Sequence, residues 1–176
     1  MVYVLLADGF EEVEAIEPID ILRRGGVSVA TVGIFGKYVT GSHNIKIEAD
    51  ITIDEVSPFD MELLMLPGGP GHTSIEKSAK ARELILYAHK NSMLSAICAS
   101  PSIIGKMGLL KGKKATCYPG FEKYLDGALV VSDKAVADGN IITGKGAGAA
   151  SEFGFLMLSA LKGKETANSV RDGMQY

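Results

Sequence analysis

A cysteine among small residues is the first position in this sequence that could do chemistry. Cys98 lies in "SAICASP" (95–101), where an apolar run ends and a pattern typical of a helix begins. A tight turn from strand to helix exposes a side chain, as in the nucleophile elbow of hydrolases, here with a thiol in place of a hydroxyl. The dipole of the helix would lower the thiol pKa. The alternative is a buried cysteine that packs as a small apolar side chain.

A glycine-rich stretch could bind a negative charge that develops near Cys98. "LPGGPG" (66–71) ends an apolar run, and Pro70 has no N–H group. Donors to an oxyanion must therefore come from the backbone of Gly68, Gly69 or Gly71. The alternative interpretation is an ordinary turn at the end of a strand.

An acidic stretch follows the first apolar run and could supply a proton. In "ADGFEEVE" (7–14), Glu14 falls at the edge of the apolar arc of the predicted helix. A desolvated carboxyl beside a thiolate would have a raised pKa and could stay protonated to donate a hydrogen bond. The alternative is an acidic first turn that only stabilises the helix dipole. Helical periodicity does not distinguish Glu14 from Glu11.

The remaining histidine and cysteine residues do not form a motif. His72 follows the glycine stretch and could line a pocket, although an exposed loop position is the favoured interpretation. His43 falls in a predicted hairpin, and we assign it no role. Cys117 is expected to be a packed thiol. The two cysteines have no CxxC spacing and no histidine cluster beside them, so we expect neither a metal site, nor a disulfide framework, nor a cofactor.

Alternating apolar and amphipathic segments predict the elements that position these residues. Several apolar runs are uniformly apolar, as buried parallel strands are. The pattern predicts one domain over residues 1–176, a doubly wound, mostly parallel α/β sheet with helices on both faces, in which loops at the carboxyl ends of the strands gather ligands. The predicted strands are 2–7, 27–34, 61–67, 93–98, 114–117 and 140–144, and the predicted helices are roughly 11–24, 77–91, 101–107, 119–125 and 149–162.

Three segments depart from this alternation. Residues 36–53 alternate polar and apolar side chains and predict an antiparallel hairpin or a pair of edge strands. A second ribbon is indicated around Asp138-Gly139, a tight-turn pair. The last residues, 163–176, predict an amphipathic terminal helix.

Composition argues against several classes of partner. Of the 176 residues, 47% are hydrophobic, and 18 Lys and Arg against 21 Asp and Glu give a formal charge of −3. Without a basic excess we expect neither nucleic acid nor an anionic membrane as a partner. No apolar stretch is long enough to cross a bilayer and the N-terminus resembles no signal peptide, so we expect a cytoplasmic protein.

Four motifs taken together resemble the ThiJ/PfpI superfamily, specifically the branch that contains the parkinsonism-associated deglycase. They are "LADGFEEVEAIEPIDILRRGG", "LPGGPG", "SAICASPSIIGKMGLLKGKKAT" and "GKGAGAASEFGF", in this order along nearly the whole chain. The resemblance implies a flavodoxin-like fold, similar to class I glutamine amidotransferases, and a homodimer. It implies that Cys98 is the nucleophile and Glu14 a protonated partner. The amides implied to line the oxyanion site are those of Gly68, Gly69 and Ala99.

Two departures from the superfamily narrow the activity. Protease-like members carry a histidine directly after the nucleophile, where this chain has Ala99, so the peptidase interpretation lacks its base. The deglycase branch often has a histidine before the proline that follows the elbow helix, where this chain has Tyr118; its hydroxyl could orient a substrate.

The resemblance implies several activities that the sequence leaves open. The first is a cofactor-free glyoxalase or deglycase that acts through Cys98 on small 2-oxoaldehydes, with methylglyoxal converted to lactate, or on early glycation adducts of proteins. The second is an oxidative-stress sensor or chaperone that acts through a cysteine sulfinate. Older labels in this superfamily refer to thiamine or thiazole monophosphate biosynthesis. A scaffold without turnover is a further alternative.

Overall fold

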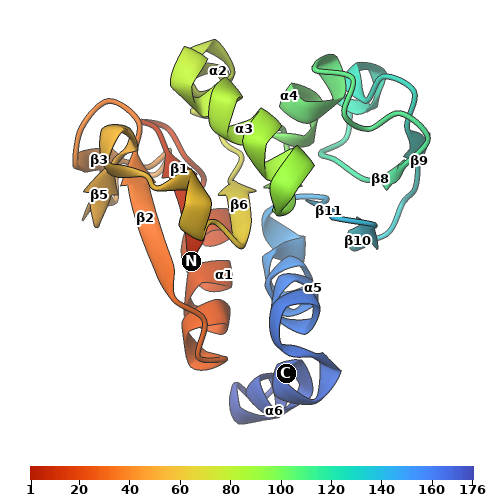
Figure 1. Ribbon diagram of the computed structural model, residues 1–176. Helices are drawn as coiled ribbons and strands as arrows, with labels where there is room; N and C mark the ends of the chain where they lie inside the picture. Colours follow the sequence, from red (N-terminus) through yellow and green to blue (C-terminus); the bar gives the residue numbers. More distant parts are fainter.

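Seven strands form one mostly parallel sheet through the centre of the molecule. The structure is a computed structural model that describes residues 1–176, and the strand order is β10-β11-β7-β6-β1-β2-β5 (Figure 1). All neighbours pair in parallel except β10 and β11. The strands are β1 (Val2–Leu6), β2 (Val29–Gly33), β5 (Ile51–Thr52), β6 (Leu63–Leu66), β7 (Met93–Ile97), β10 (Ala135–Asp138) and β11 (Ile141–Gly144).

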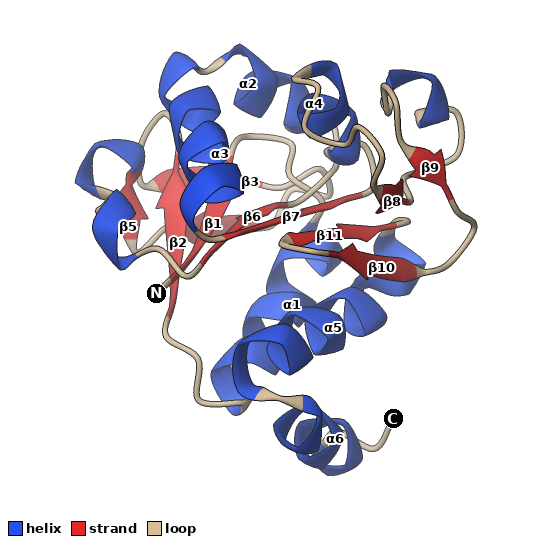
Figure 2. Ribbon diagram, turned by 45° about the vertical axis from the view of Figure 1, so that its right-hand side comes forward, coloured by secondary structure: helices blue, strands red, loops and turns tan.

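Helices cover both faces of this sheet, as Figure 2 shows. On one face lie α1 (Glu12–Arg24) and α5 (Ala150–Lys162), and on the other lie α2 (His72–Lys77), α3 (Ala79–Asn91) and α4 (Pro101–Lys106). The terminal helix α6 (Lys164–Gly173) packs on α5 and not on the sheet. The predicted doubly wound α/β fold and the amphipathic terminal helix are confirmed. None of these helices has the length and apolarity needed to span a bilayer.

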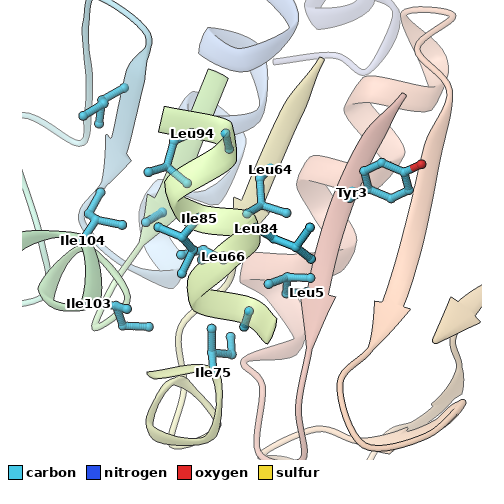
Figure 3. Packing of buried hydrophobic residues seen from close by; sticks show 14 of the residues in the cluster. Tyr3, Leu5, Leu64, Leu66, Ile75, Leu84, Ile85, Leu94, Ile103 and Ile104 are labelled. Carbon is cyan, nitrogen blue, oxygen red and sulfur yellow. The ribbon is translucent and has the colours of Figure 1, made fainter. Parts of the chain in front are cut away.

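The central strands are buried on both sides because successive side chains point to opposite faces. Every residue of β1 and β6 is buried. Leu5 and Leu64 pack toward α3, in the cluster seen in Figure 3, whereas Val4 and Met65 pack toward α1 and α5. Full burial of one such side chain contributes about 1.5–3 kcal/mol. Uniformly apolar strands therefore specify a sheet that helices must cover on both sides.

The strand order brings three loops to one edge of the sheet. From β1 the chain passes to β2 on one side, and β6 then pairs with β1 on the other, which places the topological switch point between β1 and β6. In open α/β sheets, ligands bind at the carboxyl ends of the strands at this point. The loops that follow β1, β6 and β7 meet there, as the sequence predicted.

The two predicted departures from the alternation are antiparallel pairs. Strands β3 (Tyr38–Thr40) and β4 (Lys46–Glu48) form a separate hairpin, and β5 is an edge strand beside β2. Strands β10 and β11 form the second ribbon, with Gly139 in its turn at φ 63°.

The structure corrects two sequence-based assignments and adds one helix. The predicted strand 114–117 contains only β8 (Lys114–Ala115), which pairs with β9 (Leu129–Val130) outside the main sheet. The predicted helix 119–125 is one 3₁₀ turn, because Pro119 and Gly120, the latter at φ 94°, block a regular helix. The predicted helix 77–91 is confirmed as α3, which the Ser78 hydroxyl caps, whereas the short helix α2 before it was not predicted. The 3₁₀ turns are η1 (Ile53–Glu55), η2 (Pro58–Asp60), η3 (Glu122–Tyr124) and η4 (Ala147–Ala149).

A close approach fixes the position of α4, the helix that follows the cysteine. A Cβ on Gly105 would lie 2.2 Å from the Tyr124 carbonyl oxygen and 2.8 Å from the Leu125 Cα.

We expect Gly105→Ala to lower the free energy of unfolding by about 1–3 kcal/mol, because overpacking exceeds the gain of about 1 kcal/mol in helix propensity. The control is Gly173→Ala in α6, where an added Cβ meets nothing within 4 Å. Urea unfolding measures both, and equal stabilities of the two variants would contradict the expectation.

Candidate active site

Cys98 stands at a strained turn between β7 and α4. Its φ is 65°, a left-handed conformation that costs a non-glycine residue about 1–3 kcal/mol. Two backbone hydrogen bonds hold it there: the Cys98 N–H donates to Gly144 O at 2.9 Å, and Tyr118 N–H donates to Cys98 O at 2.8 Å. The thiol is half-buried. The strained elbow predicted from the small residues is present.

Glu14 is the carboxyl that contacts the thiol. Its side chain is 1% exposed, at the start of α1, and it lies next to the Cys98 side chain, which acts to lower its pKa. The Gly68 N–H donates to Glu14 Oε2 at 2.9 Å. Periodicity left the choice between Glu14 and Glu11 open, and the structure places Glu14 against the cysteine.

The glycine loop makes room for this pair and supplies a donor to each member. Gly68 donates to Glu14, so its amide is not directed at an oxyanion beside the sulfur, which corrects that part of the prediction. The backbone amides of Gly69 and Ala99 lie beside the Cys98 thiol and act to lower its pKa. A Cβ on Gly68 would lie 2.5 Å from Cys98 Cβ and 2.5 Å from Glu14 Oε2. Only glycine fits between the two side chains.

Backbone hydrogen bonds tie the glycine loop to the loop after β1. Gly71 N–H donates to Gly9 O at 2.9 Å, and Glu11 N–H donates to Gly68 O at 3.1 Å. Gly69 takes φ 80°, and a Cβ there would lie 2.5 Å from Gly9 O. The two loops form one unit, so the positions of the amides and of Glu14 are set together.

Burial is the largest influence on the pKa values of Glu14 and Cys98. Burial raises the pKa of Glu14 to about 7, against the lowering effect of its hydrogen bonds to Cys98 and Gly68. Burial, and then the charge of Glu14, raise the pKa of the Cys98 thiol to about 12, against the Gly69 and Ala99 amides. The predicted lowering of the thiol pKa is therefore wrong. Near neutral pH the pair therefore exchanges between two protons and one, and a thiolate forms in the one-proton state when that proton resides on Glu14.

Aromatic side chains border this site. The Nδ1–H of His72 donates to Gly69 O at 2.9 Å, and the His72 ring meets Phe121 edge-on with centroids 5.6 Å apart. Tyr118, which is 50% exposed, lies 6.4 Å from Phe121 between ring centroids. A Cβ on Gly146 would lie 3.3 Å from the Tyr118 ring and 3.9 Å from Glu14 Oε1. His72 and Tyr118 thus lie around the pair, and their role as pocket residues stays a prediction. Sequence reasoning missed Phe121 because nothing in its local pattern marks it.

Glu12 is a second buried acid that the sequence did not single out. It is 6% exposed and accepts hydrogen bonds from the β3–β4 hairpin loop, the shortest from His43 N at 2.7 Å. These bonds outweigh burial and lower its pKa to about 2. Atoms of Glu11, Glu12 and His43 that could ligate a metal lie within 4.8 Å of one another. Both Glu12 oxygens already accept hairpin donors, so we assign this cluster the role of holding the hairpin on α1.

Fold and site together define a flavodoxin-like α/β protein with a cysteine at a strand-to-helix elbow and a buried glutamate paired with it. Residues 1–160 match the model of the DJ-1/PfpI family. The chain belongs to this family.

Individual relatives agree with this assignment. "Protein dj-1beta" of Drosophila melanogaster is 35% identical over 97% of this chain and 94% of its own length. The crystal structure of Drosophila melanogaster DJ-1beta superposes with a TM-score of 0.93, covering 99% of this chain and 96% of that one at 34% identity. A Caenorhabditis elegans relative named "Glutathione-independent glyoxalase DJR-1.2" is 31% identical over 91% of this chain and 87% of its own length. The chain spans 38% of the length of "Protein DJ-1 homolog B" of Arabidopsis thaliana, which is 35% identical over 93% of this chain.

The raised pKa of Glu14 predicts a specific dependence of stability on pH. The folded protein binds this proton more tightly than the unfolded chain does, because the pKa is about 7 in place of 4.5. The stabilising contribution is complete below the unfolded pKa and is lost as the pH rises through the folded pKa, by up to about 3 kcal/mol. We therefore expect Glu14→Gln to gain stability relative to wild type between about pH 4 and about pH 8.

Urea unfolding at several pH values measures this difference. Glu83→Gln, an exposed carboxyl on α3, is the matched control and should give a profile parallel to that of wild type. A Glu14→Gln profile parallel to wild type would show that Glu14 is ionised at the same pH in the folded and unfolded states.

Proposed function

We propose that this protein is a cofactor-free, cysteine-dependent glyoxalase that converts small 2-oxoaldehydes such as methylglyoxal to 2-hydroxy acids such as lactate. The observation that carries the proposal is the pairing of the Cys98 and Glu14 side chains on either side of Gly68, with the Gly69 and Ala99 amides beside the sulfur. A family relative named as a glyoxalase supports the choice of reaction. Release of early glycation adducts is the related deglycase activity that the same pair would support.

The first step is addition of sulfur to the aldehyde carbon. With the shared proton on Glu14, the Cys98 thiolate attacks C1 of methylglyoxal and a C–S bond forms while the C=O π bond opens. The amides of Gly69 and Ala99 stabilise the developing oxyanion, which then takes the proton from Glu14. The product is a neutral hemithioacetal, and Glu14 is now a carboxylate.

The second step moves a proton between carbons. The Glu14 carboxylate removes the C1 proton to give an enediolate and then returns this proton to C2. The proton of the C1 hydroxyl passes to the C2 oxygen, which leaves a lactate thioester on Cys98. Water then hydrolyses the thioester to lactate and the thiol. Every atom of methylglyoxal and one water appear in the product, so no redox cofactor is required.

Lactate production from methylglyoxal tests this proposal. We expect Cys98→Ser and Glu14→Gln each to lose at least about a hundredfold in turnover, because each removes a group that acts in the reaction itself. Cys117→Ser is the matched control, since Cys117 is a buried thiol outside the pair, and should keep wild-type activity. Lactate formation that persists in Cys98→Ser, or its absence from the wild-type protein, would exclude the glyoxalase.

A separate assay distinguishes the deglycase from the glyoxalase. A hemithioacetal of methylglyoxal with a small thiol dissociates spontaneously, and a chemical scavenger of methylglyoxal measures this rate. A deglycase must consume the adduct faster than spontaneous dissociation does. Consumption at the spontaneous rate would mean that the protein acts on free methylglyoxal alone.

The difference in burial between the cysteines favours one second candidate, an oxidative-stress sensor. Cys98 is half-buried, whereas Cys117 is 4% exposed. Peroxide would convert the Cys98 sulfur first to sulfenic and then to sulfinic acid, with oxygen atoms within reach of the Gly69 and Ala99 amides. Mass spectrometry after mild peroxide treatment should show oxygen added to Cys98 before Cys117, and equal oxidation of both would exclude the sensor. In a cytoplasmic location, which is part of this proposal, Cys98 would be kept reduced.

We further propose that the protein forms a homodimer through the outer face of α1. Val13, Ile16 and Ile45 are 45%, 43% and 56% exposed, and they line one apolar groove with Phe10 and Ile47. Contiguous apolar surface of this kind is typical of an interface, and a two-fold dimer buries the same face of both copies.

A charge in this groove should dissociate the dimer. We expect Ile16→Glu to be monomeric by light scattering coupled to size-exclusion chromatography, because a buried unpaired carboxylate is costly. Leu86→Glu on α3, where Leu86 is 50% exposed, is the matched control and should stay dimeric. A dimeric Ile16→Glu variant would place the interface elsewhere, and a monomeric wild-type protein would refute the homodimer.

A further inference from the structure

A cavity of about 360 Å³ opens between the last two helices and the start of β10. It lies outside the Cys98 site and shares no residue with it. Ala135, Leu156 and Ala167 form an apolar part of its wall. The other lining residues are Asp133, Lys134, Glu152, Phe155, Ser159, Lys164, Asn168 and Arg171.

Both helices present one continuous face to this cavity. On α5 the lining residues begin at Glu152 and recur at spacings of three and four residues to Ser159, and on α6 they do the same from Lys164 to Arg171. Residues at these spacings share a face of a helix. The cavity is therefore a product of how α6 packs on α5, the arrangement seen in Figure 1.

Four polar side chains in this wall have no partner within the chain. The side chains of Ser159, Lys164, Asn168 and Arg171 make no hydrogen bond and no ion pair with the protein. They come from both helices and line one cavity. Polar groups that converge on a concave surface without partners of their own are typical of a ligand site.

Arg171 is held in place by stacking. Its guanidinium lies over the Phe155 ring, 4.2 Å from the ring centroid. The Phe155 ring is itself buried and is fixed edge-on by Tyr176, with centroids 5.3 Å apart. A guanidinium that lies over an aromatic ring keeps the N–H groups in its own plane free to donate hydrogen bonds. Their arrangement matches carboxylate and phosphate oxygens.

The charges around the cavity favour an anion at its α6 side. Lys134 lies 3.6 Å from Glu152, and the two charges offset each other. Lys164 and Arg171 make no ion pair, although the Arg171 charge also acts on Glu152. Together with Asp133, the charged residues of the lining leave one net positive charge. The apolar wall leaves space beside these cations for a hydrocarbon group.

We propose that this cavity, which we call the α5–α6 cleft, binds a small organic oxyanion, a carboxylate or a phosphate ester with a short apolar group. Arg171 binds the oxygens in a bidentate manner, and Lys164, Asn168 and Ser159 provide further donors. The apolar group packs against Ala135, Leu156 and Ala167. The proposal does not depend on the reaction at Cys98.

Titration followed by amide NMR tests the cleft with three probes. The probes are benzoate, phenyl phosphate and inorganic phosphate, which separate carboxylate, phosphate ester and free phosphate. We expect saturable shifts of the amides of Ser159, Asn168 and Arg171 with benzoate or phenyl phosphate, and weaker binding of inorganic phosphate. Arg171→Gln should weaken the binding by about tenfold or more, because it removes a charged hydrogen bond donor.

Two variants keep the test decisive. Lys164→Gln changes an exposed residue at the start of α6 and tests the site should Arg171→Gln unfold, with an expected several-fold loss of affinity. Arg82→Gln, an exposed arginine on α3, is the matched control and should bind as wild type does. Shifts that do not saturate, shifts spread over all basic surfaces, or equal affinity in Lys164→Gln and wild type would overturn the proposal.

Discussion

The left-handed backbone of Cys98 is the constraint on which the site depends. A non-glycine residue keeps this conformation only where its surroundings determine it, and here Gly144 and Tyr118 hold the Cys98 peptide groups from two sides. The turn sends the thiol toward the switch point of the sheet, where Glu14 and the glycine loop meet it. Gly68 is required between the two side chains because any Cβ there would overlap both. The elbow, the loop and the start of α1 thus form one rigid assembly.

The close approach of Cys98 and Glu14 in this assembly determines the chemistry of the site. A helix N-terminus and two amides favour a thiolate, but burial and the neighbouring carboxyl oppose it more strongly. The pair of Cys98 and Glu14 therefore behaves as one acid whose last proton is shared. Reactivity in such a site is governed by where that proton resides. A glutamate that holds the proton at one step and releases it at the next suits a reaction that moves protons between adjacent carbons.

The surface beyond the site differs from one side of the molecule to the other. The groove on α1 is lined by five apolar and three acidic residues, and its exposed apolar side chains suit a macromolecular interface. The α5–α6 cleft instead combines a short apolar wall with polar side chains that have no partners. Both features arise because helices that cover a sheet bury one face and leave the other available.

The sequence by itself determined the class of fold, the elbow at Cys98 and the two loops that meet it, because uniform apolar runs and breaker residues are local signals. The local pattern predicted a helix at residues 119–125 that the structure lacks, because Gly120 takes a positive φ. It also gave no sign that Glu12 is buried, because the hairpin that covers Glu12 is distant in sequence. Only the tertiary structure decided that Glu14 contacts the thiol, that the Gly68 amide donates to Glu14 and not to an oxyanion, and that the thiol pKa rises. Desolvation and hydrogen bond direction depend on atoms brought together from separate loops, and spacing along the chain does not encode them.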